Sequence, residues 1–195
     1  MENIRTDHKY ILEMIKPGSN VLDLGCGDGE LLSLLIKYKN CRATGIEIDE
    51  KAIYKCVERG VTVSHGDIDS GLSDYSDKRF DYVILNESLQ EILNPEQVIA
   101  EALRVGRKVI VGIPNFCSLF ARLQILFLGR VPVTKGLPYK WYNTPNIRFL
   151  SLKDFRDFCN ERNILVEQEI SISQFGEIPI ARNLLAYTAI FQISK

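Results

Sequence analysis

Val21-Leu-Asp-Leu-Gly-Cys-Gly-Asp-Gly-Glu30 is the stretch of the chain that decides the fold. It joins a short apolar run, typical of a buried strand, to a turn rich in glycine. Glycine tolerates a positive φ and lets a ligand approach the backbone without meeting a Cβ atom. Leu31, Leu34 and Leu35 then recur at helical spacing, so residues 28–37 favour a helix. The stretch therefore predicts the strand, loop and helix that begin a ligand-binding parallel sheet.

Short runs rich in β-formers alternate with longer helical patterns along the chain, which predicts βαβ units. The expected strands cover residues 21–24, 43–48, 61–63, 80–85, 108–113, 164–173 and 185–194. The expected helices cover residues 6–15, 28–37, 50–59, 97–105, 118–128 and 152–163. Together they predict an α/β fold with a doubly wound, seven-stranded, mostly parallel sheet, in a single domain over residues 1–195.

Several of these helices have a polar residue where a helix N-cap is expected. Thr6 or Asp7 can cap the first helix, and Asp49 can cap the helix that follows the second strand. Ser151 can cap the last helix, with Asp154 at the position where a capping box has Glu or Gln.

The charge balance bears on the class of partner. Lys and Arg number 24 and Asp and Glu 25, which gives a formal net charge of −1. Broad binding to nucleic acid or to a membrane surface requires a clear cationic excess. We therefore expect neither nucleic acid nor membrane as a partner.

Cysteine and histidine usage bears on metal binding and on the compartment. The five cysteines are Cys26, Cys41, Cys56, Cys117 and Cys159. They are scattered without a CxxC pair, and only two histidines accompany them, so no metal site is expected. Reduced thiols, a polar N-terminus without the apolar core of a secretory signal, and no stretch of membrane-spanning length together predict a cytoplasmic location.

The glycine loop has the spacing GxGxG, whereas the dinucleotide-binding fingerprint is GxGxxG. It carries two acids, Asp23 and Asp28, and we expect no Arg or Lys nearby. Two carboxylates repel a pyrophosphate but attract a sulfonium or an ammonium group. The loop therefore favours a cationic ligand.

Polar residues also follow the next three strands. Glu47, 20 residues past Gly27, can accept hydrogen bonds from both hydroxyls of a ribose. Asp67 can accept from the exocyclic amine of an adenine, and Asn86 follows the fourth strand. Taken together these residues predict a pocket for a cationic adenosyl ligand. Two alternatives stay open: plain turn and surface residues at each position, and a dehydrogenase of the NAD type.

This combination resembles the seven-strand S-adenosylmethionine-dependent methyltransferase family, with its Rossmann-like fold. VLDLGCGDG matches the first motif of the family, GIEID its acidic loop, GD its adenine-contacting loop and FDYVIL its fourth strand. The resemblance implies S-adenosylmethionine or S-adenosylhomocysteine as the cofactor. The cofactor-binding set that it implies is Asp23, Gly25, Cys26, Gly27, Glu47, Ile48, Asp67, Ile68 and Asn86.

The resemblance also implies a role for most of these residues. Asp23, Gly25 and Gly27 would contact the methionine part of the cofactor and Glu47 the ribose. Asp67 and the backbone of Ile68 would contact the adenine, and Asn86 would form the wall near the methyl group.

No catalytic residue can be assigned. The residues after the fourth strand, 86–89, lack the Asn/Asp-Pro-Pro-Tyr/Phe motif of amine methylation, and Cys117 follows Phe116 rather than the proline of cytosine methylation. The side chains that could act as a base are Glu87, His65, Tyr139 and Tyr142. Glu87 and His65 can equally be solvated loop residues, and the two tyrosines can be packing or interface groups.

A segment of about residues 116–148 is inserted after the fifth strand. Its expected helix, 118–128, is apolar around most of its circumference, so one buried face cannot cover it. Tyr139, Trp141 and Tyr142 follow, interspersed with Arg and Lys. Aromatic and Arg side chains near an apolar patch are typical of a protein interface. A lid packed over the cofactor and the sheet is the alternative, and RNA binding is less consistent with the balanced charge.

The same segment resembles a narrower family. PNF (114–116), RLQ (122–124), GR (129–130), PVT (132–134), LPY (137–139), WY (141–142) and TPNIR (144–148), joined to VLDLGCGDGELL, are similar to the methionine biosynthesis protein MetW family. The resemblance implies an accessory or regulatory partner of homoserine O-acyltransferase that binds S-adenosylmethionine. The alternative is an active methyltransferase that modifies an unidentified small molecule.

Overall fold

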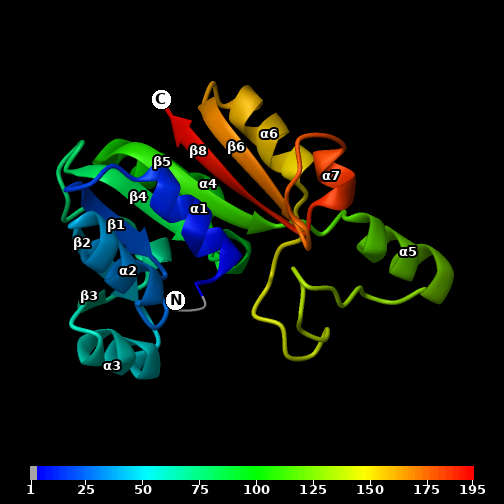
Figure 1. Ribbon diagram of the computed structural model, residues 1–195, viewed down its shortest axis with the longest axis horizontal. Helices are drawn as coiled ribbons and strands as arrows, with labels where there is room; N and C mark the ends of the chain where they lie inside the picture. The colour runs from blue at the N-terminus through cyan, green and yellow to red at the C-terminus, as the bar shows by residue number, and fades with distance from the viewer. Residues whose placement is uncertain (1–3) are drawn as a thin grey trace.

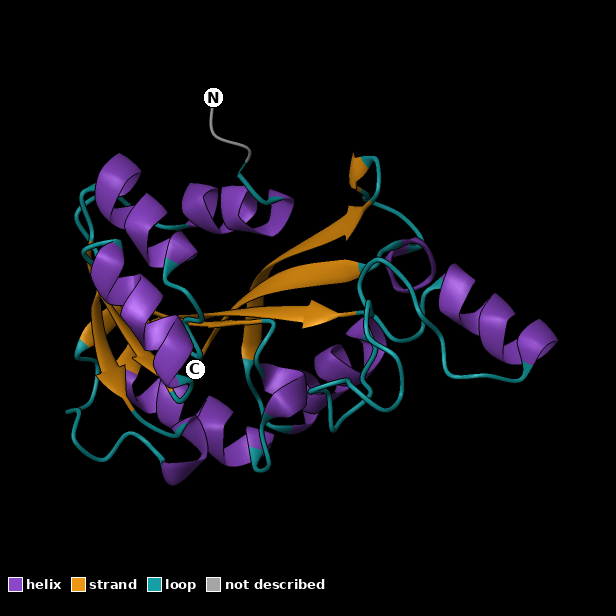
Figure 2. Ribbon diagram, turned by 90° about the horizontal axis from the view of Figure 1, so that it is seen from below, coloured by secondary structure: helices purple, strands orange, loops and turns teal. Residues whose placement is uncertain are grey.

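The computed structural model describes residues 4–195, so residues 1–3 of the polar N-terminus lie outside the described residues. One sheet runs through the molecule with helices on both of its faces (Figures 1 and 2). The strands are β1 (Asn20–Leu24), β2 (Arg42–Glu47), β3 (Thr62–His65), β4 (Phe80–Asn86), β5 (Gly106–Pro114), β6 (Leu165–Ser173), β7 (Gly176–Glu177) and β8 (Thr188–Ser194). The helices are α1 (Thr6–Met14), α2 (Glu30–Lys39), α3 (Glu50–Glu58), α4 (Pro95–Val105), α5 (Leu119–Leu128), α6 (Leu152–Glu161) and α7 (Arg182–Leu185), with 3-10 turns η1 (Ile68–Ser70) and η2 (Leu89–Glu91).

The strand order is β3-β2-β1-β4-β5-β8-β6-β7. The first five strands pair in parallel, and β8 is antiparallel to both β5 and β6. This confirms the predicted doubly wound, mostly parallel α/β sheet. Several boundaries shift by one or two residues, and two larger differences concern the last strands. The two-residue strand β7 adds an eighth strand, and the expected strand 185–194 begins only at Thr188 because α7 takes up Leu185.

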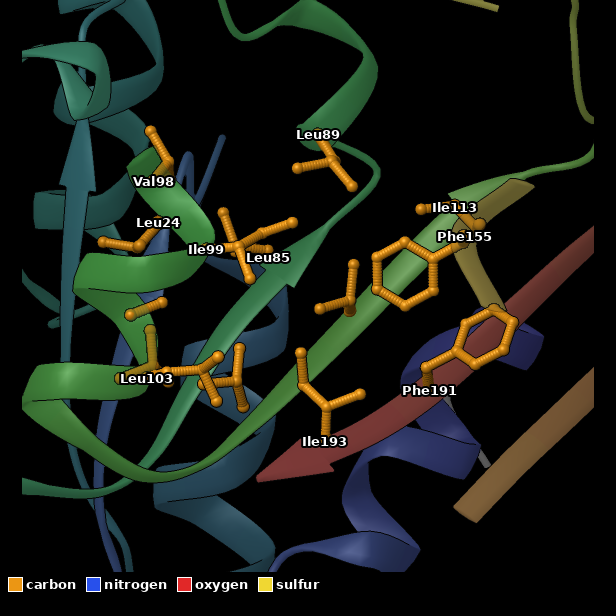
Figure 3. Packing of buried hydrophobic residues seen from close by; sticks show 14 of the residues in the cluster. Leu24, Leu85, Leu89, Val98, Ile99, Leu103, Ile113, Phe155, Phe191 and Ile193 are labelled. Carbon is orange, nitrogen blue, oxygen red and sulfur yellow. The ribbon is translucent and has the colours of Figure 1, made fainter. Parts of the chain in front are cut away.

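Apolar side chains fill the space on both faces of the sheet. On one face, Ile11 of α1, Leu35 of α2 and Cys56 of α3 pack against the strands. On the other face, α4 and α6 pack against the same strands. Figure 3 shows this second core, in which the rings of Phe155 and Phe191 lie 4.8 Å apart between centroids. The two cores hold the sheet rigid, and the loops at the carboxyl ends of its strands are built on that support.

The capping predictions have mixed outcomes. Asp49 accepts a hydrogen bond from the N–H of Lys51, and Ser151 and Asp154 form a reciprocal capping box, as expected. The cap predicted for α1 is wrong: its N-cap residue is Arg5, and no described side chain caps it. The Asp7 carboxylate instead accepts hydrogen bonds from Arg5 and from Asn86, which is 79 positions away in the sequence.

The insertion after β5 leaves the body of the molecule. Figures 1 and 2 show α5 projecting beyond the sheet, and of its residues only Ala121 is buried. The lid interpretation is therefore wrong for this helix, because it does not pack over the sheet. The insertion is tied back at its end, where the N–H groups of Ile147 and Arg148 both donate to the carbonyl of Gln90, at 3.0 and 3.1 Å. Among residues 4–195, no helix combines the length and apolarity needed to cross a bilayer.

Candidate functional site

The candidate site lies at the carboxyl ends of β1, β2 and β4, where the strand order reverses between β1 and β4. Ligands of open α/β sheets bind at such a reversal. Gly25 and Gly27 follow β1 with φ of 75° and 55°. A Cβ atom on Gly25 would lie 3.1 Å from the Cβ of Ser88, so glycine lets the loops after β1 and β4 meet. A Cβ atom on Gly27 would have no neighbour within 4 Å, which leaves open space at that backbone.

Glu47, the last residue of β2, holds the glycine loop in place. It is only 9% exposed. Its Oε2 accepts from the N–H of Gly27 at 2.8 Å, and its Oε1 accepts from the N–H groups of Ile48 and Asp49 at 2.8 and 2.9 Å. A carboxylate offers about four acceptor positions, so Glu47 keeps capacity for a further donor.

Asp23 is the buried acid of the site. It is 3% exposed, and its side chain makes no hydrogen bond or ion pair within the part of the chain that the structure describes. Burial, and secondly the charge of Glu47, raise the pKa of Asp23 to about 7. A buried carboxylate without a counter-charge is costly. A cation placed beside Asp23 would remove that cost.

Asp28 contributes less to the acidity of the loop than the sequence suggested. Its Oδ2 accepts from the guanidinium of Arg59 at 2.7 Å. The expectation that no Arg or Lys lies near the loop was therefore wrong, because Arg59 comes from the end of α3, 31 residues away. The attraction for a cationic ligand consequently depends on Asp23.

Cys26 lies beneath the loop rather than facing a ligand. It is buried with its Sγ 4.0 Å from the Sγ of Cys56. Burial raises the pKa of the Cys26 thiol, so the thiolate is disfavoured. Its contribution to a binding site would be through packing and backbone.

Asp67 and Ile68 lie at the neighbouring strand end, beyond β3. The N–H of Gly66 donates to the carbonyl of Glu47 at 3.0 Å, which places this loop beside the glycine loop. Asp67 is exposed, and its side chain accepts from the N–H of Asp69 at 2.9 Å. Ile48 is 60% exposed and Ile68 half-buried, so this side of the site offers apolar surface next to a carboxylate.

On the other side of β1, Asn86 belongs to a polar network with the N-terminal helix. Its Nδ2 donates to Asp7 Oδ2 at 2.9 Å. Arg5 donates to Asp7 and to Glu87 Oε2, at 2.8 and 2.7 Å. Sequence reasoning missed Arg5 and Asp7, because partners about 80 positions apart leave no local signal. Glu87 lies on the loop after β4 with its side chain 39% exposed, in agreement with a solvated loop residue, and it is paired with Arg5.

The other candidate bases are dispersed. His65 is exposed at the end of β3, with its Nε2 3.2 Å from the carbonyl oxygen of Ile48. Tyr142 is exposed on the insertion and packs edge-on against Trp141. The structure therefore does not bring His65, Tyr142 and Glu87 together into one catalytic cluster.

A cavity of about 390 Å³ adjoins the network around Asn86. It lies between the start of α1, the residues after β4, the start of β8 and the returning part of the insertion. The lining residues are Arg5, Thr6, Asp7, Glu87, Gln90, Glu91, Pro114, Lys135, Gly136, Pro138, Tyr139, Asn146, Tyr187 and Thr188. Of the tyrosines considered from the sequence, Tyr139 contributes to it. Glu91 was not singled out from the sequence, and Lys135 was noted only as one of the basic residues that accompany the aromatic side chains of the insertion.

Comparison with known families and proteins gives matches over most of the chain. The family described as methionine biosynthesis protein MetW matches residues 5–193. A bifunctional methionine biosynthesis protein MetXA/MetW from Rhodopirellula baltica is 36% identical over 176 residues, which cover 86% of this chain and 28% of that protein. This chain therefore corresponds to one part of that longer relative.

Solved structures support the fold. A SAM-dependent methyltransferase from Thermotoga maritima superimposes with a TM-score of 0.70 at 18% identity, covering 97% of this chain and 88% of that chain. A SAM-dependent methyltransferase from Archaeoglobus fulgidus superimposes with a TM-score of 0.67 at 17% identity, covering 97% and 91%. At these identities the likeness establishes the methyltransferase fold and no more than the fold.

Proposed function

This chain belongs to the methionine biosynthesis protein MetW family, and from that premise we propose that it is a cytoplasmic S-adenosylmethionine-binding protein. In this proposal residues 1–195 act as a single domain and as an accessory, regulatory partner of a homoserine O-acyltransferase. The cofactor is the downstream product of methionine synthesis, so a protein that binds it on an early enzyme can report the state of the pathway. The free state of all five cysteines is consistent with a reducing compartment.

The observation that carries the cofactor proposal is the buried, unneutralised Asp23 beside an open glycine backbone. The bound cofactor would supply a methyl group on a positively charged sulfur. Asp23 would face its cationic methionine part, with the backbone of Gly25 and Gly27 against it. Glu47 keeps one acceptor position for a ribose hydroxyl.

The remaining residues of the proposed site would hold the two ends of the cofactor. Ile48 and Ile68 offer apolar surface for the adenine, and Asp67 an acceptor for its amine. Asn86 would form the wall near the methyl group, its side chain fixed by Asp7.

Calorimetry tests this cofactor proposal. We expect S-adenosylmethionine and S-adenosylhomocysteine to bind, and NAD not to bind, because the spacing GxGxG departs from the GxGxxG fingerprint and the buried carboxylates of Asp23 and Glu47 would repel a pyrophosphate. NAD binding in the absence of adenosyl-ligand binding would contradict the proposal.

Two observations support the partner proposal. The name of the Rhodopirellula relative joins MetXA and MetW in one chain, an arrangement that keeps two parts at high effective concentration. Separately, α5 carries a large exposed apolar surface, with Leu126 and Phe127 73% and 74% exposed. Exposed apolar patches of this kind mark protein interaction sites. We assign the docking surface to α5 on this basis.

Replacing Phe127 with glutamate is expected to weaken the complex with the homoserine O-acyltransferase at least ten-fold. The substitution removes a large aromatic side chain, the kind that dominates the binding energy of protein interfaces. It also places a charge in an apolar contact. The folded chain should be unaffected, since Phe127 makes no core contact. The measurements are copurification and acyltransferase turnover with and without the variant.

Val57→Glu is the matched control for this variant. Val57 is also an exposed apolar residue on a helix, but it lies on α3, at the opposite end of the molecule (Figure 1). Equal loss of the complex with both variants would argue against α5 as the docking surface. No complex and no change in turnover with the unmodified chain, at any level of either adenosyl compound, would refute the partner proposal itself.

A second candidate function is methyl transfer to a small molecule. The cavity of about 390 Å³ next to Asn86 favours it, because an acceptor there would lie beside the proposed position of the methyl group. Formation of S-adenosylhomocysteine that depends on an added acceptor would establish this activity. Cofactor binding without turnover across a broad set of metabolites would speak against it.

A further inference from the structure

The insertion of residues 116–148 differs from the rest of the chain in its charge. It carries five of the 24 Lys and Arg residues and none of the 25 Asp and Glu residues. Its charge is therefore +5, and that of the remaining residues, with 19 cations and 25 acids, is −6. The formal net charge of −1 conceals this separation. The five cations are Arg122, Arg130, Lys135, Lys140 and Arg148.

The chain does not neutralise these cations itself. All five are exposed, and none forms an ion pair with an acid among residues 4–195. Arg122 and Arg148 donate to backbone carbonyls, and Lys140 lies over a tyrosine ring, so these contacts orient the cations without neutralising them. Elsewhere in the chain Arg side chains pair with acids, as Arg162 does with Glu96 at 2.6 Å. The charge of the insertion is therefore available to a partner of opposite charge.

The helix of the insertion, α5, has apolar side chains on opposite sides. Residues two positions apart on an α-helix point in nearly opposite directions, and Ile125 and Phe127 are 48% and 74% exposed. Arg122 is the one charged residue of α5. A helix that lies in a membrane surface requires a strongly polar face, which α5 lacks. An apolar groove that encloses the helix fits it better, and Figures 1 and 2 show α5 projecting from the body, where such a groove can receive it.

We propose that the insertion docks into an apolar groove with an acidic rim on the homoserine O-acyltransferase. In this arrangement α5 fills the groove, and the unneutralised cations of the insertion face the rim. Protein interfaces commonly combine an apolar centre with a polar rim in this way. The inference rests on the proposed function for the identity of the partner. It adds the chemistry of the face on which the partner receives this chain.

Association kinetics test the inference. Charges at the rim of an interface act mainly on the association rate, and salt screens their effect. We expect the association rate of this chain with the acyltransferase to fall at least about ten-fold between about 50 and about 500 mM NaCl, with little change in the dissociation rate. A complex whose association rate does not respond to salt overturns the inference and leaves the proposed function.

Charge reversal locates the effect. Arg130→Glu combined with Lys140→Glu should slow association about ten-fold and flatten its salt dependence. Neither side chain makes a hydrogen bond within residues 4–195, so the variant should unfold at the same temperature as the unmodified chain. Arg42→Glu combined with Lys55→Glu is the matched control, because it changes the net charge equally at two exposed positions outside the insertion. It should slow association no more than about two-fold, and equal slowing by both pairs overturns the inference.

Three further measurements examine other occupants of the same surface. They are sedimentation with phosphatidylglycerol vesicles, titration with a single-stranded RNA oligonucleotide, and sedimentation velocity of the chain alone. We expect no binding and no self-association at about 150 mM NaCl. Binding or self-association that the Arg130 and Lys140 reversals abolish overturns the inference. No complex with the acyltransferase at any of these salt concentrations overturns the proposed function, a result distinct from a complex that forms without responding to salt.

Discussion

Replacing Glu47 with alanine is expected to weaken S-adenosylmethionine binding at least about ten-fold. One hydrogen bond from a ribose hydroxyl to the remaining acceptor position of the carboxylate is worth about 1.5–3 kcal/mol, and each 1.4 kcal/mol is a factor of about ten. The substitution also leaves the N–H groups of Gly27, Ile48 and Asp49 without their acceptor. The glycine loop should then lose its fixed position as well as its ligand contact. Calorimetry on the purified variant measures the loss.

Glu50→Ala is the control for this variant, because Glu50 is an exposed acid three positions further along the chain. It should bind the cofactor as the unmodified chain does. Glu47→Gln should have an intermediate effect, since an amide keeps one acceptor but turns its NH₂ toward a backbone N–H. An unchanged dissociation constant for Glu47→Ala would mean that Glu47 is not the ribose ligand.

The parts of this molecule that the sequence predicts are those set by local chemistry. The caps at Asp49 and Ser151 are formed by side chains within three residues of their partners. The strand-end positions of Asp23 and Glu47 follow from the alternation of strands and helices, because parallel strands bring their carboxyl ends to one edge of the sheet. Such features require no knowledge of which distant segments meet.

The features that sequence reasoning missed all depend on long-range contacts. Arg59 neutralises Asp28 from 31 positions away, and a separation of 79 positions conceals the link between Asp7 and Asn86. The apolar circumference of α5 was visible in the sequence, but whether it would be covered by the same chain was not. Its exposure depends on where the insertion re-joins the body, at the carbonyl of Gln90.

Asp23→Asn is expected to remove a pH dependence of stability that the unmodified chain carries. The pKa of Asp23 is about 7 in the folded chain, against an ordinary value of 3.8. Between these values the folded chain holds a proton that the unfolded chain has lost. The stability that this group contributes is therefore complete below about pH 4 and is lost as the pH rises to about 7. A difference of about three pKa units corresponds to about 4 kcal/mol.

Urea unfolding across this pH range measures the effect. The free energy of unfolding of Asp23→Asn, minus that of the unmodified chain, should increase by about 4 kcal/mol from about pH 4 to about pH 8. Asp74→Asn is the control, because it makes the same substitution at an acid that is exposed to solvent. A difference that stays constant with pH would mean that Asp23 titrates as an ordinary acid and has no special need for a cation.

The same titration links Asp23 to its proposed ligand. A positively charged ligand stabilises the carboxylate form of Asp23, so binding must lower its pKa and release a proton wherever the free chain holds one. We expect nearly one proton to be released per S-adenosylmethionine bound at about pH 6, and almost none at about pH 8. Calorimetry in two buffers of different ionisation enthalpy measures this number, and Asp23→Asn should release none at either pH. Binding at about pH 6 without proton release would show that the charge of the ligand lies away from Asp23, whatever the affinity.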